Sequence, residues 1–394
     1  MTDGEERRLK VLHIATSFAT DETSTVTPWL TRLVQAQRRA GMDVHVLTSA
    51  LHGLGDGHYG DLPVWRFRYS PKRIENLAHE VAIYEKMRRQ PLRYAQAPLF
   101  LLGGWLKARK LRAQKYDVVH VHWPVPMGLI ALPFRGARIV YHYHQTELSL
   151  ARRFPLLRRL FGPVLRRADI HLCNSSFTRG RLDELYGGMR SEIVPMPLAW
   201  DVPPSLPPKE PGRILFVGRM IAWKGGDLLI RAGGLLKQRG LDFKLVFVGE
   251  GPERDAWQAL AAELDVPAEF PGPKVQAALM EEYARAAVFA LPSRFDDRVW
   301  VESLGVVLLE AMACGTAVVA SRVGGPLDIV FDERNGLFFE PFNFEDLAGK
   351  LARLLQDFPL AQQMGRAGLL VAAEHTPEAI AQRLRGIYER LLAG

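Results

Sequence analysis

The chain has 394 residues, which at roughly 150 residues per domain indicates two or three domains. Hydrophobic residues make up 48% and charged residues 24% of it, a composition that excludes a wholly disordered chain. The longest uncharged apolar run, residues 97–106, is far shorter than the roughly 20 residues of a membrane-spanning helix, and residues 1–10 lack the apolar core of a signal peptide. We therefore expect a cytoplasmic location.

The net charge of +8 is unevenly distributed. Residues 1–195 carry 30 Lys and Arg against 17 Asp and Glu, whereas residues 196–394 carry 21 against 26. The basic half is expected to meet an anionic partner such as a membrane surface or a phosphate. The sequence contains no familiar nucleic-acid-binding motif. Its two cysteines, Cys173 and Cys314, are expected to be buried free thiols, and no local Cys/His cluster indicates structural zinc.

Short apolar stretches alternate with helical stretches through the first half of the chain. This alternation is typical of a doubly wound α/β domain with a parallel sheet, whose ligands lie at the carboxyl ends of the strands. The predicted strands are Leu9–Ala15, Asp43–Ser49, Val64–Tyr69, Val118–Trp123, Arg138–His144, Ile170–Ser175 and Glu192–Met196. The predicted helices are Pro28–Ala40 and segments near residues 98–114, 151–167 and 176–187.

A proline-rich stretch interrupts this pattern. Residues 201–212 are predicted to link a first domain, residues 1–200, to a second domain, residues 213–376. In the second domain the same alternation begins again. The predicted strands are Arg213–Val217, Phe243–Gly249, Ala268–Phe270, Ala287–Leu291 and Ala317–Ser321, and the predicted helices are Lys224–Gln238, Glu253–Leu264, Val275–Ala284 and Glu302–Ala313. The fold class is therefore predicted as two Rossmann-like domains facing across a cleft.

Two cations follow the first strand of the second domain. Arg219 and Lys224 lie in a loop that leads into a helix, a position suited to binding a diphosphate. A solvated surface arginine and a helix-start lysine would be the structural alternative. The later stretch Val248–Glu253 (VGEGPE) is weak evidence for a dinucleotide site and indicates a tight turn.

Two glutamates frame the stretch Glu302–Glu310 (ESLGVVLLE). We expect Glu302 to lie in a loop and Glu310 within the following helix, because a 3.6-residue repeat does not place them on one face. The backbone N–H groups of Ser303, Leu304, Gly305 and Val306 would then be free to bind an anion. Apolar neighbours indicate that Glu310 is buried, so its carboxylate needs partners: sugar hydroxyls, or alternatively nearby backbone.

Together these motifs resemble the GT-B glycosyltransferases of family 4, also called group 1. The resemblance rests on GRMxxxKGG at residues 218–226, GEGP at 249–252, the two glutamates followed by AMACG at 311–315, and VGG at 323–325. The first half matches more loosely, through residues 117–123 (DVVHVHW), 144–148 (HQTEL) and 168–175.

The resemblance implies a role for each matching residue. Arg219 and Lys224 would hold the donor diphosphate, and Glu310 would bind the ribose hydroxyls. Glu302 and the backbone of residues 303–306 would face the donor sugar and its phosphate. His144 would contact the donor from the first domain. The resemblance also implies that the last helix, residues 377–394, packs on the first domain.

The family resemblance further implies a retaining reaction without a metal, in which a sugar leaves a UDP- or GDP-linked donor for a hydroxyl of a glycan or lipid-linked acceptor. Cell-envelope polysaccharide or glycolipid synthesis is the expected setting. A nucleotide-sugar 2-epimerase-like isomerase and a non-catalytic nucleotide-binding partner are the alternatives. Turnover of a donor would separate the last of these from both enzymes.

Three features depart from the family pattern or leave roles open. The loop Ser17–Ser24 has no glycine where the family has two, so it is expected to contact its ligand differently. Gln145 and Glu147 replace a glycine and an aspartate, which leaves His142 and His144 as alternative functional histidines on one strand face. The basic, apolar segment 152–167 is either a membrane-surface helix or an ordinary packed helix.

Overall fold

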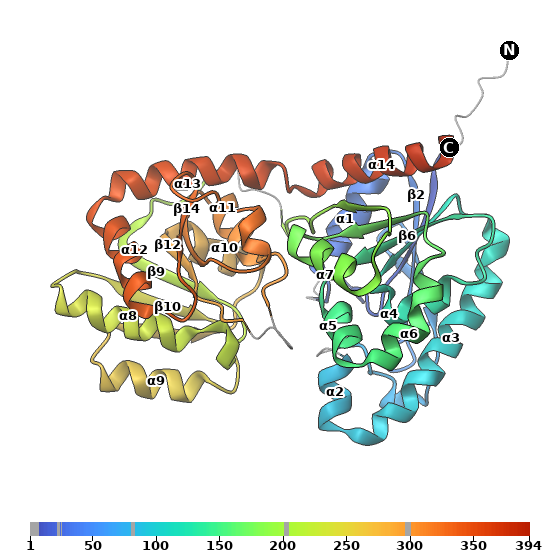
Figure 1. Cartoon of the computed structure of the whole chain (residues 1–394), viewed down its shortest axis with the longest axis horizontal. Helices are drawn as coiled ribbons and strands as arrows, with labels where there is room; N and C mark the ends of the chain where they lie inside the picture. The colour runs from blue at the N-terminus through green and yellow to red at the C-terminus, as the bar shows by residue number, and fades with distance from the viewer. Residues whose placement is uncertain (1–7, 22–23, 25, 80–82, 201–204, 296–300) are drawn as a thin grey trace, which may run out of the picture. The chain divides into compact units, whose positions relative to one another are not determined.

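The computed structural model describes the chain outside residues 1–7, 22–23, 25, 80–82, 201–204 and 296–300. The chain divides into two compact units, each with its own sheet (Figure 1). The first unit comprises residues Met1–Pro197 together with Pro377–Gly394, and the second comprises Leu198–Thr376. Across the described residues, no helix combines the length and the apolar character that crossing a bilayer requires.

The first unit is built on an eight-stranded sheet in the order β3-β4-β2-β1-β5-β6-β7-β8. Every neighbouring pair is parallel except β3 with β4 at one edge, an antiparallel pair that the sequence did not predict. The strands are β1 (Lys10–Ile14), β2 (Asp43–Ser49), β3 (Gly57–Tyr59), β4 (Leu62–Phe67), β5 (Val118–His122), β6 (Arg138–Tyr143), β7 (Ile170–Cys173) and β8 (Ser191–Ile193).

Helices cover the sheet of the first unit. In α1, Leu30, Leu33, Val34 and Gln37 recur at helical spacing and are all buried, which makes Gln37 a polar residue on a core-facing stripe. The last helix, α14, packs against α1 and shares its apolar core. The helices are α1 (Pro28–Arg39), α2 (Ile83–Arg89), α3 (Gln96–Leu111), α4 (Pro124–Met127), α5 (Thr146–Arg153), α6 (Pro155–Leu165), α7 (Ser176–Tyr186) and α14 (Pro377–Ala393).

The second unit has a six-stranded sheet in the order β11-β10-β9-β12-β13-β14, with every neighbouring pair parallel. Its strands are β9 (Glu210–Val217), β10 (Lys244–Val248), β11 (Ala268–Gly272), β12 (Ala286–Leu291), β13 (Ala317–Ser321) and β14 (Gly336–Phe339). Its helices are α8 (Gly226–Gln238), α9 (Arg254–Glu263), α10 (Gln276–Arg285), α11 (Val306–Ala313), α12 (Phe344–Gln356) and α13 (Phe358–Ala373).

Three sequence predictions of local structure were wrong. The predicted helix over residues 151–167 is two helices, α5 and α6, because extended backbone at Phe154 precedes Pro155, which begins the second helix. Residues 210–212 of the predicted linker form the start of β9, so its strand begins before Arg213; residues 201–204 of the linker lie outside the described residues. The helix predicted from Glu302 begins at Val306.

Each sheet has one point at which the chain changes the direction in which it adds strands. In the first unit this point lies between β1 and β5, and in the second between β9 and β12. Parallel α/β sheets bind ligands beside this point, at the carboxyl ends of the strands. The loops after β1, β5, β9 and β12 are therefore the places to look for a functional site in each unit.

Candidate active site

The loop that follows β9 carries Arg219 and is held by the turn that follows β10. The N–H of Met220 donates to the carbonyl of Glu250 at 2.8 Å, and the N–H of Glu253 donates to the carbonyl of Met220 at 3.0 Å. The GEGP motif therefore supports the loop that carries Arg219. The Arg219 side chain itself is exposed, at the carboxyl end of the strand.

Lys224 and Glu302 lie together, although 77 residues separate them in the sequence. The Nζ of Lys224 is 2.6 Å from Oε2 of Glu302, and each side chain is only about one-seventh exposed. The hydroxyl of Ser293 donates to the same oxygen at 3.2 Å, and the ammonium lies 4.4 Å from the ring centre of Trp223. The structure thus joins the lysine predicted to bind a diphosphate and the carboxylate predicted to be catalytic in one ion pair.

Gly225 fixes this pair against the end of β12. Its φ of +72° is in the left-handed region, and a Cβ atom there would lie 2.0 Å from the carbonyl oxygen of Pro292. Any other residue would push the loop away from the strand. The glycine after Lys224 therefore sets the position of the lysine.

The backbone between the two glutamates is supported by the VGG turn. The N–H of Gly325 donates to the carbonyl of Glu302 at 2.9 Å, and a Cβ atom on Gly325 would lie 2.0 Å from the carbonyl oxygen of Ser303. Gly305 precedes the first residue of α11, Val306, and Leu304 is buried beneath the turn. Residues 303–306 therefore form a tightly packed approach to the N-terminus of α11.

Glu310 lies inside α11 and is buried, as its apolar neighbours predict. The hydroxyl of Tyr283 on α10 donates to Oε2 of Glu310 at 2.8 Å. Burial raises the pKa of Glu310 to about 7, an effect that the Tyr283 hydrogen bond partly opposes. Its partner is thus a side chain, where the sequence left sugar hydroxyls and backbone as alternatives.

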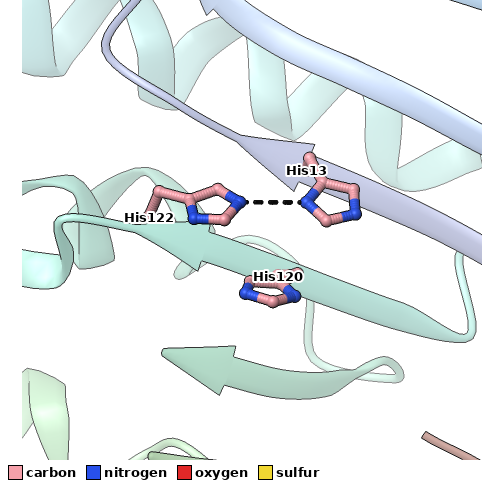
Figure 2. A group of neighbouring side chains, drawn as sticks. All are labelled: His13, His120 and His122. Carbon is pink, nitrogen blue, oxygen red and sulfur yellow. Dashed lines mark hydrogen bonds between the residues drawn. The ribbon is translucent and has the colours of Figure 1, made fainter. Parts of the chain in front are cut away.

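In the first unit, five buried histidines gather at the switch between β1 and β5. His13 lies on β1, His120 and His122 on β5, and His142 on β6 with His144 directly after it. Figure 2 shows three of them, with the hydrogen bond between His13 and His122. From the sequence, only His142 and His144 were candidate functional histidines. For His120 and His122 the signal was the alternation of histidines on two neighbouring strands, which are paired with His122 opposite His142; the lone His13 on β1 gave no such signal.

Spacing within this cluster is compatible with a metal ion. The ring nitrogens available in the triads His13–His120–His122 and His122–His142–His144 lie within 4.8 Å of one another. No local Cys/His cluster is visible in the sequence because the three strands are far apart along the chain. However, every ring nitrogen of the five histidines except Nδ1 of His144 takes part in a hydrogen bond. The absence of a metal requirement stays a prediction.

His144 differs from His142 in having a nitrogen to offer. Both nitrogens of His142 are bonded, to His120 and to the carbonyl of Val194, whereas the buried Nδ1 of His144 has no partner among the described residues. The rings of Trp29 and Trp123 pack against His144 with centroid distances of 5.0 and 4.8 Å. The geometry therefore favours His144 of the two candidates.

The turn after His144 is strained. Gln145 has a φ of +83° at a position where the resembled family has glycine, and its side chain donates to the Ser149 hydroxyl at 2.8 Å. Glu147 accepts the His144 N–H at 2.8 Å through Oε1, and burial raises its pKa to about 7. The turn therefore carries backbone strain at Gln145, a feature that concentrates at functional sites.

The glycine-free loop after β1 is only partly described. Ser17 and Phe18 are buried, whereas residues 22 and 23 of the stretch Ser17–Ser24 lie outside the described residues. The predicted difference in ligand contact at this loop stays a prediction.

Comparison with protein families gives two adjacent matches. Residues 201–384 match the model described as glycosyl transferases group 1, and residues 28–201 match that of glycosyltransferase family 4. A D-inositol 3-phosphate glycosyltransferase of Acidothermus cellulolyticus is 30% identical over 344 residues, which cover 77% of this chain and 75% of that protein. A GDP-mannose-dependent alpha-(1-6)-phosphatidylinositol monomannoside mannosyltransferase of Mycolicibacterium smegmatis is 30% identical over 258 residues, 61% of this chain and 67% of that protein.

Solved structures share the fold over nearly the whole chain. Sucrose-phosphate synthase from Thermosynechococcus elongatus superposes with a TM-score of 0.76 at 21% identity, covering 98% of this chain and all of that one. The Anabaena protein HepE in complex with UDP superposes with a TM-score of 0.71 at 18% identity, covering 97% of this chain and all of that one.

Proposed function

Because this chain belongs to the group 1, family 4 glycosyltransferases of the GT-B fold, we propose that it is a retaining enzyme that transfers a sugar from a UDP- or GDP-linked donor to a hydroxyl of a glycan or lipid-linked acceptor. The observation that carries this proposal is the arrangement of Lys224, Glu302 and Glu310 around the switch point of the second sheet. A role in cell-envelope polysaccharide or glycolipid synthesis is part of the proposal.

The second unit supplies charge where the leaving group develops it. As the bond between the sugar and the phosphate breaks, the nucleoside diphosphate gains negative charge, which Arg219 and Lys224 would stabilise together with the backbone of residues 303–306. Such fixed groups favour the transition state over the ground state. The Glu302 carboxylate, 2.6 Å from Lys224, holds that ammonium in place and would face the donor sugar.

Glu310 would bind the ribose hydroxyls of the donor. A carboxylate accepts hydrogen bonds from two adjacent hydroxyls, and Tyr283 already orients one of its oxygens at 2.8 Å. His144 of the first unit would contact the transferred sugar through its unpartnered Nδ1. The acceptor hydroxyl would lose its proton to the departing phosphate on the same face of the sugar, which would give a retaining outcome without a protein base or a metal.

An exposed apolar stripe supports a lipid-linked acceptor. Leu99, Leu102 and Leu106 lie at helical spacing on α3, are each about half exposed, and lead to the exposed Arg109 and Lys110. On α6, Leu156 is 69% and Leu160 is 60% exposed next to Arg158 and Arg159. Exposed leucines next to arginines and lysines are typical of a surface that rests on anionic lipid. Peripheral membrane binding through this surface is the proposed basis of acceptor access.

A donor screen followed by product analysis tests the proposal. Nucleoside diphosphates and nucleotide sugars, with and without EDTA, are first tested for thermal stabilisation; a ligand at 100 times its Kd contributes about 2.7 kcal/mol. The stabilising donor is then incubated with inositol phosphates and phosphatidylinositol glycans as acceptors. NMR of the product gives the anomeric configuration.

We expect one base series to stabilise the chain and the product to keep the donor's anomeric configuration. Inversion would refute the retaining mechanism, and an epimerised nucleotide sugar without acceptor consumption would establish the isomerase alternative. Nucleotide binding with no turnover of any donor would establish the non-catalytic alternative.

Flotation with anionic vesicles tests the proposed membrane surface by comparing the wild type with the double variant Leu102→Ser/Leu106→Ser. Equal flotation of both proteins would refute membrane binding through this surface.

A further inference from the structure

The five histidines of the first unit belong to one unbranched chain of hydrogen bonds that begins at a backbone carbonyl. Nε2 of His142 lies 2.9 Å from the carbonyl oxygen of Val194, and Nδ1 of His142 lies 3.2 Å from Nε2 of His120. A carbonyl oxygen only accepts, so His142 carries its proton on Nε2 and accepts through Nδ1. His120 must then donate from Nε2, which leaves its own Nδ1 bare.

The chain continues through two side chains from helices. Nδ1 of His120 lies 2.6 Å from the hydroxyl of Tyr388 on α14, and the Tyr388 oxygen lies 3.3 Å from Nε2 of Gln37 on α1. The tyrosine must donate to the bare nitrogen of His120, and its oxygen accepts from the Gln37 amide. This orientation points Oε1 of Gln37 at Nε2 of His13, 2.7 Å away, so His13 also carries its proton on Nε2.

The last two links repeat the same polarity. Nδ1 of His13 lies 3.0 Å from Nε2 of His122, and Nδ1 of His122 lies 3.1 Å from Nε2 of His144. Each bare Nδ1 requires an N–H from the next ring. His144 therefore also has its proton on Nε2, and its Nδ1, which has no partner among the described residues, is a bare acceptor.

The surroundings keep every ring neutral. All five histidines are at most 6% exposed, and burial lowers the pKa of each; the pKa values of His13 and His142 fall to about 4. A second proton on His13, His122 or His142 would also place two N–H groups against each other at one of the ring-to-ring links. The order of donors and acceptors is therefore the same along the whole chain.

We propose that this one-way hydrogen-bond chain from the Val194 carbonyl to His144 fixes the tautomer of His144, and that Tyr388 and Gln37 are positioning residues for it. With its tautomer fixed, His144 presents a neutral acceptor through Nδ1. The group it takes is an uncharged hydroxyl that donates a hydrogen bond; a carboxylate at the same place would meet lone pair with lone pair. The identity of that hydroxyl as one of the donor sugar rests on the proposed function.

The first experiment measures the tautomers directly, in the full chain labelled with ¹⁵N-histidine. Protonated and bare ring nitrogens resonate in separate regions of the ¹⁵N spectrum, and loss of signals in His144→Gln assigns the terminal ring. We expect His144 at neutral pH to be protonated on Nε2 alone. A proton on Nδ1, or on both nitrogens, would overturn the proposal.

The second experiment interrupts the hydrogen-bond chain without substituting a histidine. Tyr388→Phe removes one hydroxyl, after which the Gln37 amide is free to turn, and we expect His144 to show both tautomers. Gln37→Leu cuts the adjacent link and serves if Tyr388→Phe does not fold. Tyr116→Phe is the matched control, because it removes a buried hydroxyl 2.8 Å from Nδ1 of His45, outside the chain. An unchanged His144 spectrum in folded Tyr388→Phe would refute the positioning role.

Kinetics separate this inference from the proposed function. If half of the molecules carry the wrong tautomer, the donor KM of Tyr388→Phe rises about twofold with kcat unchanged. Tyr116→Phe should leave both parameters unchanged. If no donor is turned over while the tautomers are as proposed, the proposed function is refuted and the inferred hydrogen-bond chain is supported. If turnover occurs with His144 protonated on Nδ1, the inferred hydrogen-bond chain is refuted and the proposed function is supported.

Discussion

The two units put polar side chains at the same topological point but satisfy them by different means. At the switch of the second sheet, an ammonium and a carboxylate neutralise each other, as Lys224 does with Glu302. At the switch of the first sheet, neutral rings satisfy each other in series. The ammonium of an ion pair can attract an anionic ligand, whereas a series of neutral rings presents an oriented hydrogen-bond acceptor that carries no charge. The difference would suit the two parts of the proposed nucleotide-sugar donor: an anionic diphosphate and an uncharged sugar.

The largest expected effect breaks the charged side of this comparison. Lys224→Ala removes the cation proposed for the diphosphate and leaves the Glu302 carboxylate without its ion partner, so we expect transfer to fall by on the order of a hundredfold or more. Lys237→Ala is the matched control, since it removes an exposed lysine of the same unit that pairs with exposed Asp265. Steady-state rates with both variants check this. Activity of Lys224→Ala within twofold of wild type would refute the role of Lys224.

A second effect concerns the titration of Glu310. Because burial raises its pKa to about 7, the fraction of carboxylate, and with it ribose binding, should increase as the pH rises from 6 to 8. Glu310→Gln keeps an oxygen for the Tyr283 hydroxyl but cannot ionise. We expect donor affinity roughly tenfold weaker at pH 8 and no longer dependent on pH through this group. Calorimetric titration of the nucleoside diphosphate at several pH values measures it.

A third effect distinguishes the units by their acid stability. Folding lowers the pKa values of the clustered histidines, so below about pH 6.5 the unfolded first unit binds more protons than the folded one. The folded state of this unit therefore loses stability as the pH falls from 6.5 toward 4. His13 alone should contribute about 2 kcal/mol between pH 7 and pH 5. Glu147 in the same unit has the opposite effect on stability, because its pKa is raised to about 7, but it is a single group against five histidines.

In the second unit, Glu310 has a raised pKa and therefore gives the opposite sign: the folded state binds the extra proton between pH 4.5 and 7. Hydrogen exchange at pH 7 and pH 5, corrected for intrinsic rates, should show amides of β5 and β6 losing protection while those of β9 and β12 keep it. Equal loss in both units would contradict this comparison.

The smallest expected effect is at the turn after His144. Gln145→Gly relieves a backbone φ of +83° and removes the hydrogen bond to Ser149, so a net stabilisation of about 1 kcal/mol is expected. Ser149→Ala removes that hydrogen bond while keeping the strain and should not stabilise. Chemical denaturation of both variants measures the difference, and destabilisation by Gln145→Gly would show that the turn is not strained.

Much of the fold and of the second site could be predicted because the signals are local. Continuous apolar runs such as Ala317–Ser321 become fully buried parallel strands. Arg219, Lys224, Glu302 and Glu310 lie within short motifs after the proline-rich stretch, so the sequence placed them in one unit, and the family resemblance implied their roles. The break at Phe154 was missed because the arginine and leucine pattern continues across it, although Pro155 begins a helix of its own.

The histidine chain could not be predicted in the same way. His13 and His120 are brought together only by the pairing of β1 with β5, and Tyr388 joins them only because α14 packs on α1. No local pattern encodes the order of donors and acceptors, since each ring's tautomer depends on its neighbour. Besides the alternating histidines of β5, the polar Gln37 within the apolar stripe of α1 was a local sign of a buried network beneath that helix.

The place of Tyr388 in this chain of bonds has a consequence for biosynthesis. Helix α14 leaves the ribosome after every strand of both sheets, so the early strands β1, β5 and β6 can pair long before their histidines acquire a common orientation. Until the last helix docks, His13, His122 and His144 are free to exchange tautomers. Docking of α14 would then act as the step that fixes the tautomer of His144, and a nascent chain that lacks α14 would bind its substrate more weakly.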